Sequence, residues 1–309
     1  MDLAIVGMGK IAQDQHLPAA ADSAFFSLAA IVDQRAVDAG VPVFGSIEDL
    51  VASGFRGAVA ICTPPAARFD IARVALEAGL HTLLEKPPGL ATSEVDQLAD
   101  LARRNAVTLF AAWHSREAAM VAPAKAYLAE RQVHDVAISW REDIRRWHPG
   151  QNWILDEGGF GVFDPGINAL SILTEIVPGA HRVESCLLEI PQGRASPITA
   201  QLALRLANGS SAAADLDFTE TDEQVWEIRV KTDAEELVLA DGGARLLIGG
   251  NPVPPSPGPG PGPGEYVRLY ERFRQLVENE QSDADSAPLA LVEDAFRVGR
   301  RESVAAFAF

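Results

Sequence analysis

The chain has 309 residues, which is enough for about two domains of ordinary size. It is 48% hydrophobic and 22% charged, as globular proteins are, and its net charge of −17 excludes non-specific nucleic-acid binding, which needs a basic face. No apolar run is long enough to span a bilayer, the first strand leaves no room for a signal peptide, and the two cysteines have no metal or redox spacing. We therefore expect a cytoplasmic protein with no metal site and no membrane or nucleic-acid partner.

Short apolar strands alternate with helical patterns through about residue 115. Strands are predicted at residues 3–6, 28–32, 58–62, 81–84 and 107–111, with helices at 67–78 and 93–104. Continuous apolar strands separated by helices indicate a parallel sheet covered on both faces. Ligands of such sheets bind beyond the carboxyl ends of the strands, so the residues that end each strand are candidate site residues.

The first strand runs into Gly7, Gly9 and Ala12, in the pattern Gly-x-Gly-x-x-Ala. In a strand–turn–helix unit, this pattern places backbone N–H groups and a helix N-terminus against a pyrophosphate. The pattern alone also fits a glycine turn without a ligand, but here it follows directly on an apolar strand. Asp33 closes the next strand, where an acidic residue binds the adenosine ribose and repels a 2′-phosphate, whereas nearby Arg35 could receive that phosphate. The sequence therefore predicts dinucleotide binding, with NAD favoured and NADP possible.

Three further strand ends carry candidate residues. Thr63 and Pro64 end the third strand, and Lys86 follows the fourth, where it could bind a substrate hydroxyl or stabilise an oxyanion. His114 follows the fifth strand and could donate to a sugar hydroxyl or relay a proton. Each also fits an ordinary role as a rigid turn, a solvated lysine or a packed histidine. Together, at one edge of the sheet, they carry more weight than any one alone.

The pattern changes after a helix predicted at about 118–131. Apolar residues now alternate along strands, as at Val136, Ile138 and Trp140, which predicts a largely antiparallel sheet with one covered face. We expect an α/β Rossmann domain over residues 1–117 and an α+β domain with a large open sheet over 118–309. We also expect the C-terminal helices to pack on the first domain. Exposed apolar residues on the open face would make it a homodimer surface.

A helix predicted from about 165 to 176 begins next to Asp164. An aspartate before a proline is a strong N-cap signature, which gives Asp164 a structural role. Asp164 and Asn168, four residues apart, also share one helix face, so Asp164 could be a general base with Asn168 as its hydrogen-bond partner.

Two loops stand out by composition. The loop at 145–153 combines tryptophans with polar groups, which suits stacking on a sugar and equally fits a loop pinned by buried tryptophans. Residues 251–264 contain a run of alternating proline and glycine, and we expect a flexible surface connection there, followed by an amphipathic helix.

These motifs resemble those of the Gfo/Idh/MocA family of nicotinamide-dependent oxidoreductases over nearly the whole chain. The resemblance is carried by the motif at 7–12, the prolines after Thr63, the run Glu85–Lys86–Pro87 and the glycine-rich run into Asp164. Within the family the chain most resembles bacterial aldose 1-dehydrogenases that act on L-arabinose and D-galactose. The closer resemblance is carried by residues 9–18, 113–116, 145–151 and 163–168.

The resemblance implies a role for each matching residue. Lys86 and Asp164 match catalytic residues, and Asn168 replaces the histidine of many members, which leaves Asp164 as the base. The implied sugar contacts are His114, Glu142, Trp147 and Trp226. The predicted cofactor contacts are Gly7, Gly9, Lys10, Ile11, Asp33, Gln34, Thr63, Pro64, Glu85 and Lys86. Asp33 and Gln34 replace a phosphate-binding serine–arginine pair of the arabinose enzyme, which favours NAD.

The implied activity is NAD(P)-dependent oxidation of an aldopyranose, L-arabinose, D-galactose or D-fucose, at C1 to the aldonolactone. Asp164 would remove the proton of the C1 hydroxyl, which Lys86 and Asn168 would hold and polarise. Two alternatives stay open: an oxidoreductase of this fold that acts on a cyclic polyol or dihydrodiol, and a non-enzymatic NAD(P)-sensing regulator. The intact Lys86 and Asp164 and the acidic chain count against the regulator.

Overall fold

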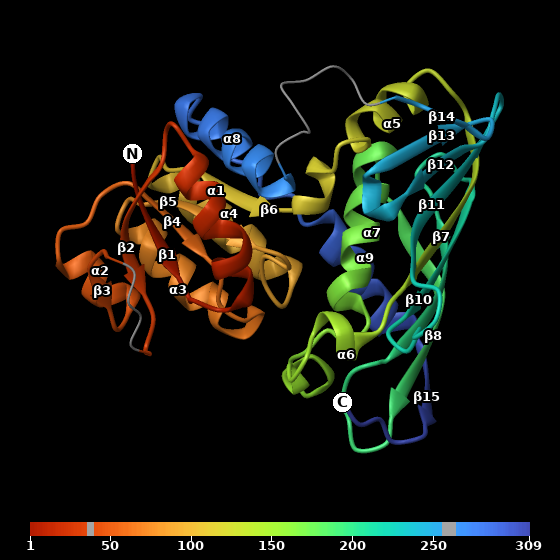
Figure 1. Cartoon of the computed structure of the whole chain (residues 1–309), viewed down its shortest axis with the longest axis horizontal. Helices are drawn as coiled ribbons and strands as arrows, with labels where there is room; N and C mark the ends of the chain where they lie inside the picture. Colours follow the sequence, from red (N-terminus) through yellow and green to blue (C-terminus); the bar gives the residue numbers. More distant parts are fainter. Residues whose placement is uncertain (36–39, 255–263) are drawn as a thin grey trace. The chain divides into compact units, whose positions relative to one another are not determined.

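A computed structural model describes residues 1–35, 40–254 and 264–309, which form two compact units (Figure 1). The first unit contains Met1–His114 and Pro263–Ser286, and the second contains Ser115–Gly262 and Ala287–Phe309. The chain therefore passes between the units three times. The sequence prediction placed a boundary after residue 117 and C-terminal helices on the first domain. Most of the proline–glycine segment lies outside the described residues.

The sheet of the first unit has six strands in the order β3-β2-β1-β4-β5-β6, and all of them pair in parallel. The strands are β1 (Asp2–Val6), β2 (Ser27–Val32), β3 (Val43–Phe44), β4 (Ala58–Ile61), β5 (His81–Glu85) and β6 (Leu109–Ala112). The helices are η1 (Ala12–His16), α1 (Leu17–Asp22), α2 (Ile47–Ala52), α3 (Pro65–Glu77), α4 (Thr92–Arg104) and α8 (Glu265–Glu278). The predicted parallel Rossmann sheet is confirmed, with the two-residue strand β3 in addition.

Two apolar cores cover the two faces of this sheet. Successive residues of β1 point to opposite faces, so Leu3 and Ile5 lie in one core and Ala4 and Val6 in the other. We call the core with Leu3 and Ile5 the first core and the core with Ala4 and Val6 the second core. Helices α2, α3 and α4 pack in the second core. The first core takes α1 and the apolar stripe of α8, which consists of Tyr266, Leu269, Tyr270, Phe273, Leu276 and Val277. Each fully buried aliphatic or phenylalanine side chain contributes roughly 1.5–3 kcal/mol, so α8 is an integral part of this unit.

The second unit contains a mixed sheet of nine strands in the order β14-β13-β12-β11-β7-β10-β9-β8-β15. The strands are β7 (Val133–Arg141), β8 (Arg182–Pro191), β9 (Thr199–Arg205), β10 (Ser211–Asp217), β11 (Val225–Thr232), β12 (Leu237–Ala240), β13 (Arg245–Ile248), β14 (Asn251–Pro252) and β15 (Arg300–Val304). Only the pairs β7–β10 and β8–β15 are parallel among these strands, so the predicted mainly antiparallel sheet is confirmed.

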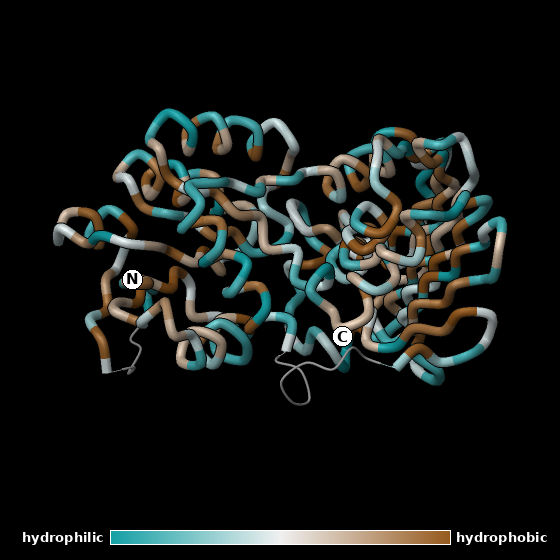
Figure 2. Tube along the Cα trace, turned by 90° about the horizontal axis from the view of Figure 1, so that it is seen from above, coloured by the Kyte–Doolittle hydropathy of each residue, from teal (hydrophilic) through white to brown (hydrophobic). Residues whose placement is uncertain are grey.

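Helices cover one face of this sheet. The helix η2 (His114–Glu117) crosses from the first unit into the second. The other helices of the second unit are α5 (Val121–Leu128), α6 (Ile144–Trp147), η3 (Asn152–Leu155), α7 (Phe163–Ile176), η4 (Asp241–Gly243) and α9 (Ala287–Val298). Apolar segments recur along the strands in Figure 2 because alternate residues such as Val136 and Ile138 are buried. At Gly166 a Cβ atom would lie 2.6 Å from Leu216 Cδ1, so glycine lets α7 approach the sheet closely and fixes the place of Asp164.

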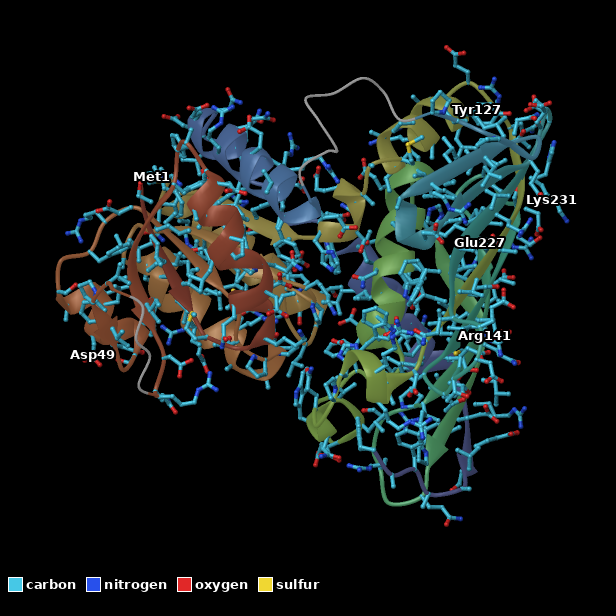
Figure 3. All side chains as sticks on the ribbon, in the orientation of Figure 1. Met1, Asp49, Tyr127, Arg141, Glu227 and Lys231 are labelled. Carbon is cyan, nitrogen blue, oxygen red and sulfur yellow. The ribbon has the colours of Figure 1, made fainter. Side chains whose placement is uncertain are left out.

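The open face of the sheet is charged rather than apolar. Arg141 pairs there with Asp217 and Glu220 at 3.3 and 3.4 Å, and Arg141 and Lys231 point away from α7 in Figure 3. None of the exposed large hydrophobic residues in the described part of the chain lies on these strands. The expectation of exposed apolar residues on this face is therefore wrong.

Candidate active site

The turn after β1 has the geometry expected of a dinucleotide-binding loop. Gly7 has φ +89°, and a Cβ atom there would lie 3.0 Å from Thr63 Cγ2, so both its conformation and its surroundings require glycine. A Cβ atom at Gly9 would meet nothing within 4 Å, so the loop has open space beside it. The helix that follows contains the π-turn η1, a feature that is frequent at functional sites.

A cavity of about 600 Å³ lies next to this loop within the first unit. Six of the ten predicted cofactor contacts line it: Gly7, Gly9, Asp33, Gln34, Thr63 and Pro64. Sequence reasoning missed Ser46 and Asp70 in its lining, and the serine that caps α2 was the available signal. A cavity of this size beside a glycine loop and a helix N-terminus fits the adenosine and phosphate portion of a dinucleotide.

The other four predicted cofactor contacts lie outside this cavity lining. Lys10 is exposed and pairs with Asp14, and Ile11 packs against the first core. Glu85 and Lys86 lie at the carboxyl end of β5.

Asp33 binds both the glycine loop and Arg35. The Met8 N–H donates to Asp33 Oδ2 over 2.7 Å, and Arg35 Nε and Nη2 donate to the two carboxylate oxygens over 3.0 Å each. The side-chain hydrogen bonds of Arg35 keep the pKa of Asp33 far below its ordinary value, so the carboxylate is ionised. Because the guanidinium neutralises this charge, Asp33 repels a 2′-phosphate less than an unpaired aspartate would.

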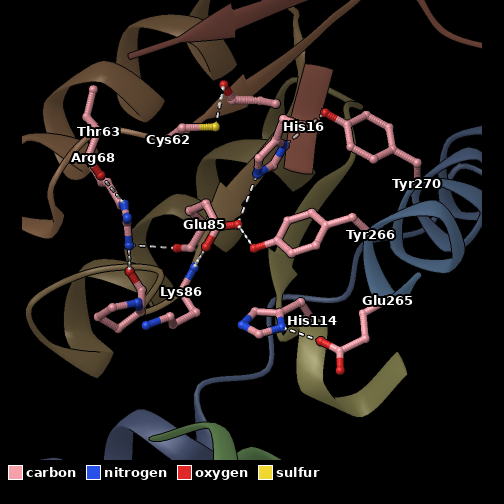
Figure 4. Close-up of polar contacts among 12 residues, drawn as sticks. His16, Cys62, Thr63, Arg68, Glu85, Lys86, His114, Glu265, Tyr266 and Tyr270 are labelled. Carbon is pink, nitrogen blue, oxygen red and sulfur yellow. Dashed lines mark hydrogen bonds and ion pairs between the residues drawn. The ribbon is translucent and has the colours of Figure 1, made fainter. Parts of the chain in front are cut away.

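A buried carboxylate organises the turn that carries Lys86 (Figure 4). Glu85 is 2% exposed, and its Oε2 accepts the Lys86 N–H over 2.8 Å. Its Oε1 accepts the Tyr266 hydroxyl over 2.6 Å and lies 3.0 Å from His16 Nε2. Arg68 donates to the backbone oxygen of Glu85 over 2.8 Å. The Lys86–Pro87 peptide bond is cis.

Glu85 and His16 form a buried ion pair. Burial alone would lower the pKa of His16, but its contacts with Cys62, Tyr270 and Glu85 raise it well above 6.5. Burial alone would raise the pKa of Glu85, but the hydrogen bond and charge of His16 hold it far below its ordinary value. The pair and its tyrosine partners therefore form a charged network under the Lys86 turn.

Replacing Glu85 with glutamine is expected to lower the free energy of unfolding by about 3–5 kcal/mol near neutral pH, because His16 loses its buried partner. The folded-state pKa of Glu85 is depressed, so the stability it contributes is fully present above its ordinary pKa of 4.5. That stability is lost as the pH falls through the folded-state value. In denaturant unfolding, the difference between wild type and E85Q should therefore shrink as the pH drops below 4.5. A difference that stays constant contradicts the ion pair.

His114 is held by α8. Its Nδ1 lies 2.6 Å from Glu265 Oε2, and its ring stacks on Tyr266 with centroids 5.3 Å apart. The predicted sugar contact at His114 therefore has a fixed orientation. Sequence reasoning missed both partners in α8, which lie 151 residues or more from His114 in the chain.

In the second unit, His148 lies between two buried carboxylates. Its Nε2 is 3.6 Å from Glu142 Oε1, and its Nδ1 is 3.8 Å from Asp164 Oδ2. Glu142 is 5% exposed and Asp164 is 7% exposed. Trp226 donates from Nε1 to Glu142 Oε2 over 2.7 Å. The structure thus brings the predicted residues Glu142, Asp164 and Trp226 together near His148. The predicted site residues did not include His148, although it lies in the 145–153 loop that the sequence analysis singled out.

Asp164 does not cap α7. The helix begins at Phe163 with Val162 as its N-cap, so the N-cap prediction for Asp164 is wrong. Asp164 lies inside the first turn, where the helix dipole favours a carboxylate over a neutral acid. The predicted partner Asn168 is half-buried one turn further along the same helix.

The tryptophans of the 145–153 loop are exposed rather than buried. Trp147 is 42% and Trp153 is 38% exposed, so the alternative of a loop pinned by buried tryptophans is wrong. Trp147 donates to Gln224 Oε1 over 2.5 Å and meets Trp226 edge-on, with ring centroids 5.7 Å apart. Two aromatic faces beside Glu142 and Asp164 suit the C–H face of a sugar.

In the described residues no group of His, Cys, Asp and Glu could hold a metal ion, and no helix is long and apolar enough to cross a membrane. Burial raises the pKa of the Cys186 thiol to about 12, as expected for a core residue.

Residues 1–113 match a family described as oxidoreductases with an NAD-binding Rossmann fold, Gfo/Idh/MocA. The chain is also 40% identical to galactose 1-dehydrogenase of Pseudomonas fluorescens over 306 residues, which cover 99% of this chain and 98% of that protein. The chain belongs to the Gfo/Idh/MocA family of oxidoreductases, and its first unit is an NAD-binding Rossmann domain.

Solved structures include similar chains. A D-galactose-1-dehydrogenase from Rhizobium etli is 44% identical, with a TM-score of 0.93 over 99% of this chain and 97% of that one. A 3-ketoreductase from Actinomadura kijaniata, solved with NADP and TDP-benzene, is 17% identical and shares the fold, with a TM-score of 0.83 over 98% of this chain and 99% of that one. The full-length similarity to galactose dehydrogenases supports sugar dehydrogenase activity.

Proposed function

We propose that this chain oxidises D-galactose, or an aldopyranose of the same ring configuration such as L-arabinose or D-fucose, at C1 to the aldonolactone, with NAD as the hydride acceptor. One observation carries the proposal. The buried carboxylates of Asp164 and Glu142 both lie next to His148 and beside two tryptophans, in a chain that is similar over its full length to galactose 1-dehydrogenases.

Asp164 would accept the proton of the C1 hydroxyl. Asp164 lies in the first turn of α7, and His148 beside it could receive the proton next and pass it outward. Lys86 and Asn168 would hold the C1 oxygen, and the positive charge of Lys86 would stabilise negative charge that develops there. When bound, the dinucleotide supplies the hydride acceptor.

Glu142, Trp147, Trp226 and His114 would bind the remainder of the sugar. Glu142 accepts from Trp226, so its carboxylate is oriented to accept sugar hydroxyls as well. Trp147 and Trp226 would stack on the sugar ring. Selection for a pyranose would then come from the residues that bind its hydroxyls.

The test is the formation of reduced nicotinamide with D-galactose, L-arabinose, D-fucose, D-glucose, a cyclic polyol and a dihydrodiol, with NAD and NADP in parallel. Turnover of the first three in preference to the others supports the proposal. Silence with every aldose, while NADH still binds, would reject it. Turnover of the polyol or dihydrodiol would then support the other oxidoreductase, and no turnover at all would support a regulator.

Replacing Asp33 with serine is expected to raise the ratio of kcat/KM for NADP over NAD by about tenfold to a hundredfold. The change removes the repelling carboxylate and releases Arg35 to bind the 2′-phosphate, a shift of roughly 1.4–2.8 kcal/mol. Steady-state kinetics with both cofactors measures it. R35A is the matched control and should lower the same ratio, so the proposal fails if D33S leaves the ratio unchanged.

We also propose a homodimer through the open face of the nine-stranded sheet, supported by the breadth of this face and its rows of charged pairs. Light scattering that gives a monomer at micromolar concentration would contradict it.

A further inference from the structure

The first turn of α8 contacts two different parts of the candidate site. Glu265 bonds to His114, which follows β6, and Tyr266 bonds to Glu85, which ends β5 (Figure 4). These partners lie 151 and 181 residues away in the chain, yet they meet two consecutive residues of one helix. All four belong to the first unit.

Glu265 determines how the imidazole of His114 is used. A carboxylate only accepts hydrogen bonds, so at 2.6 Å the Nδ1 of His114 must carry the proton. In the neutral ring, Nε2 is then the acceptor. The tautomer with its proton on Nδ1 is the less common one in a free histidine side chain. The stack on Tyr266, with 21° between the ring planes, fixes the ring orientation as well. Such outer partners orient a histidine and set its basicity.

Tyr266 acts on Lys86 through Glu85. Its hydroxyl donates to Glu85 Oε1 over 2.6 Å, and the other oxygen of the same carboxylate accepts the Lys86 N–H over 2.8 Å. One carboxylate thus joins α8 to the backbone of Lys86. His16 bonds to the same Oε1 atom, so Glu85 keeps a partner when the tyrosine hydroxyl is removed.

These polar contacts are additional to the packing of α8. Leu269, Phe273 and Leu276 of this helix are at most 2% exposed in the first core and suffice to hold it there. The Glu265 carboxylate and the Tyr266 hydroxyl bond to His114 and Glu85, which lie at the ends of β6 and β5. Glu265 and Tyr266 are therefore placed as outer partners that orient site residues.

We propose that Glu265 and Tyr266 are positioning residues for the reaction: Glu265 sets the tautomer and orientation of His114 for binding the sugar, and Tyr266 holds Lys86 in place through Glu85. The proposal rests on the proposed function. It assigns the two neighbouring residues different kinetic effects, because His114 contributes to sugar binding and Lys86 to the chemical step.

The kinetic test uses E265A, E265Q and Y266F with D-galactose and NAD. E265A is expected to raise the KM for the sugar about tenfold with kcat within about threefold, since one charge-assisted hydrogen bond is lost. E265Q keeps an oxygen that accepts from Nδ1 and should restore most of the loss. Y266F keeps the ring that stacks on His114 and should lower kcat about tenfold with little change in KM.

V277A is the matched control for a general loosening of α8. Val277 lies in the same core near the other end of the helix, and its truncation lowers Tm without touching either contact. It should leave kcat and KM within about twofold of wild type at temperatures well below Tm. The proposal is overturned if E265A and Y266F change the same kinetic parameter. It is also overturned if V277A, with a Tm lowered as much as theirs, changes kcat and KM as much as they do.

A second measurement does not depend on turnover. In ¹⁵N-histidine NMR spectra, with the signals of His114 assigned from H114N, the wild-type ring should carry its proton on Nδ1, and E265A should shift it toward Nε2. An unchanged tautomer overturns the role of Glu265 even in an active enzyme. If no aldose is turned over but the tautomer shifts as expected, the proposed function fails while the orientation of His114 by Glu265 stands.

Discussion

D164N is expected to lower kcat for D-galactose by roughly 10²–10⁴-fold, the range that a general base contributes. Asparagine matches the aspartate in shape and still fits the first turn of α7, but it cannot accept the proton of the C1 hydroxyl. The dissociation constant of NADH should stay unchanged, because the cofactor residues lie in the first unit. Steady-state kinetics and NADH fluorescence titration measure the two quantities.

The matched control is D156N. Asp156 belongs to the same unit and pairs with Arg194 at 2.7 Å, and its carboxylate is about half exposed and is not in the cluster around His148. This variant should keep kcat within about twofold of wild type, as surface changes do. The loss of a general base should leave at most about a hundredth of wild-type kcat. If D164N retains more than about a tenth, the base is another group, and His148 is the next candidate.

K86M is expected to lower kcat/KM by roughly 10²–10³-fold, with most of the loss in kcat. The change removes the charge that would stabilise negative charge on the C1 oxygen, and losing one such group in other enzymes costs about this much. The Lys86 N–H still reaches Glu85 in the variant, so the turn keeps its backbone contact and Tm should change little.

Lys231 provides the control for removing a lysine charge. It lies on the open face of the nine-stranded sheet with its side chain about two-thirds exposed, and K231M should match wild type in kcat and KM. A K86M variant that raises only the sugar KM would show that Lys86 binds the substrate without stabilising charge in the transition state.

Much of the fold could be predicted from the sequence because the hydrophobic patterns of the two units differ. Unbroken apolar runs such as residues 58–61 are buried on both faces, whereas the alternation of Val136 and Ile138 marks a sheet with one covered face. The same alternation places Ser139 and Arg141 on the other face, so the charged character of that face was already present in the sequence. The expectation of exposed apolar residues on this face gave too little weight to these alternate positions.

The error at Asp164 has a physical reason. Proline lacks an N–H, and the first four N–H groups of a helix have no partner within the helix, so a proline fits several positions of the first turn. The sequence therefore allowed the helix to begin at Phe163, where Val162 already has helical backbone angles. Asp164 therefore lies inside the first turn of α7 and not at its N-cap.

The contacts of α8 could not be predicted from the sequence. Its apolar stripe identified a helix that packs on a core, but the stripe does not say on which core or beside which strand end. Tyr266 carried a weak signal, because a buried tyrosine hydroxyl needs a hydrogen-bond partner. Only the folded chain shows that this partner is Glu85.

In the proposed reaction, hydride leaves C1 of an aldopyranose. We would incubate the protein with D-[1-²H]galactose and NAD and determine the mass of the reduced cofactor and of the sugar product. We expect one deuterium in the reduced nicotinamide and galactonolactone, or the acid it hydrolyses to, as the product. Reduced cofactor without deuterium, with a ketone at another carbon of the sugar, would contradict it.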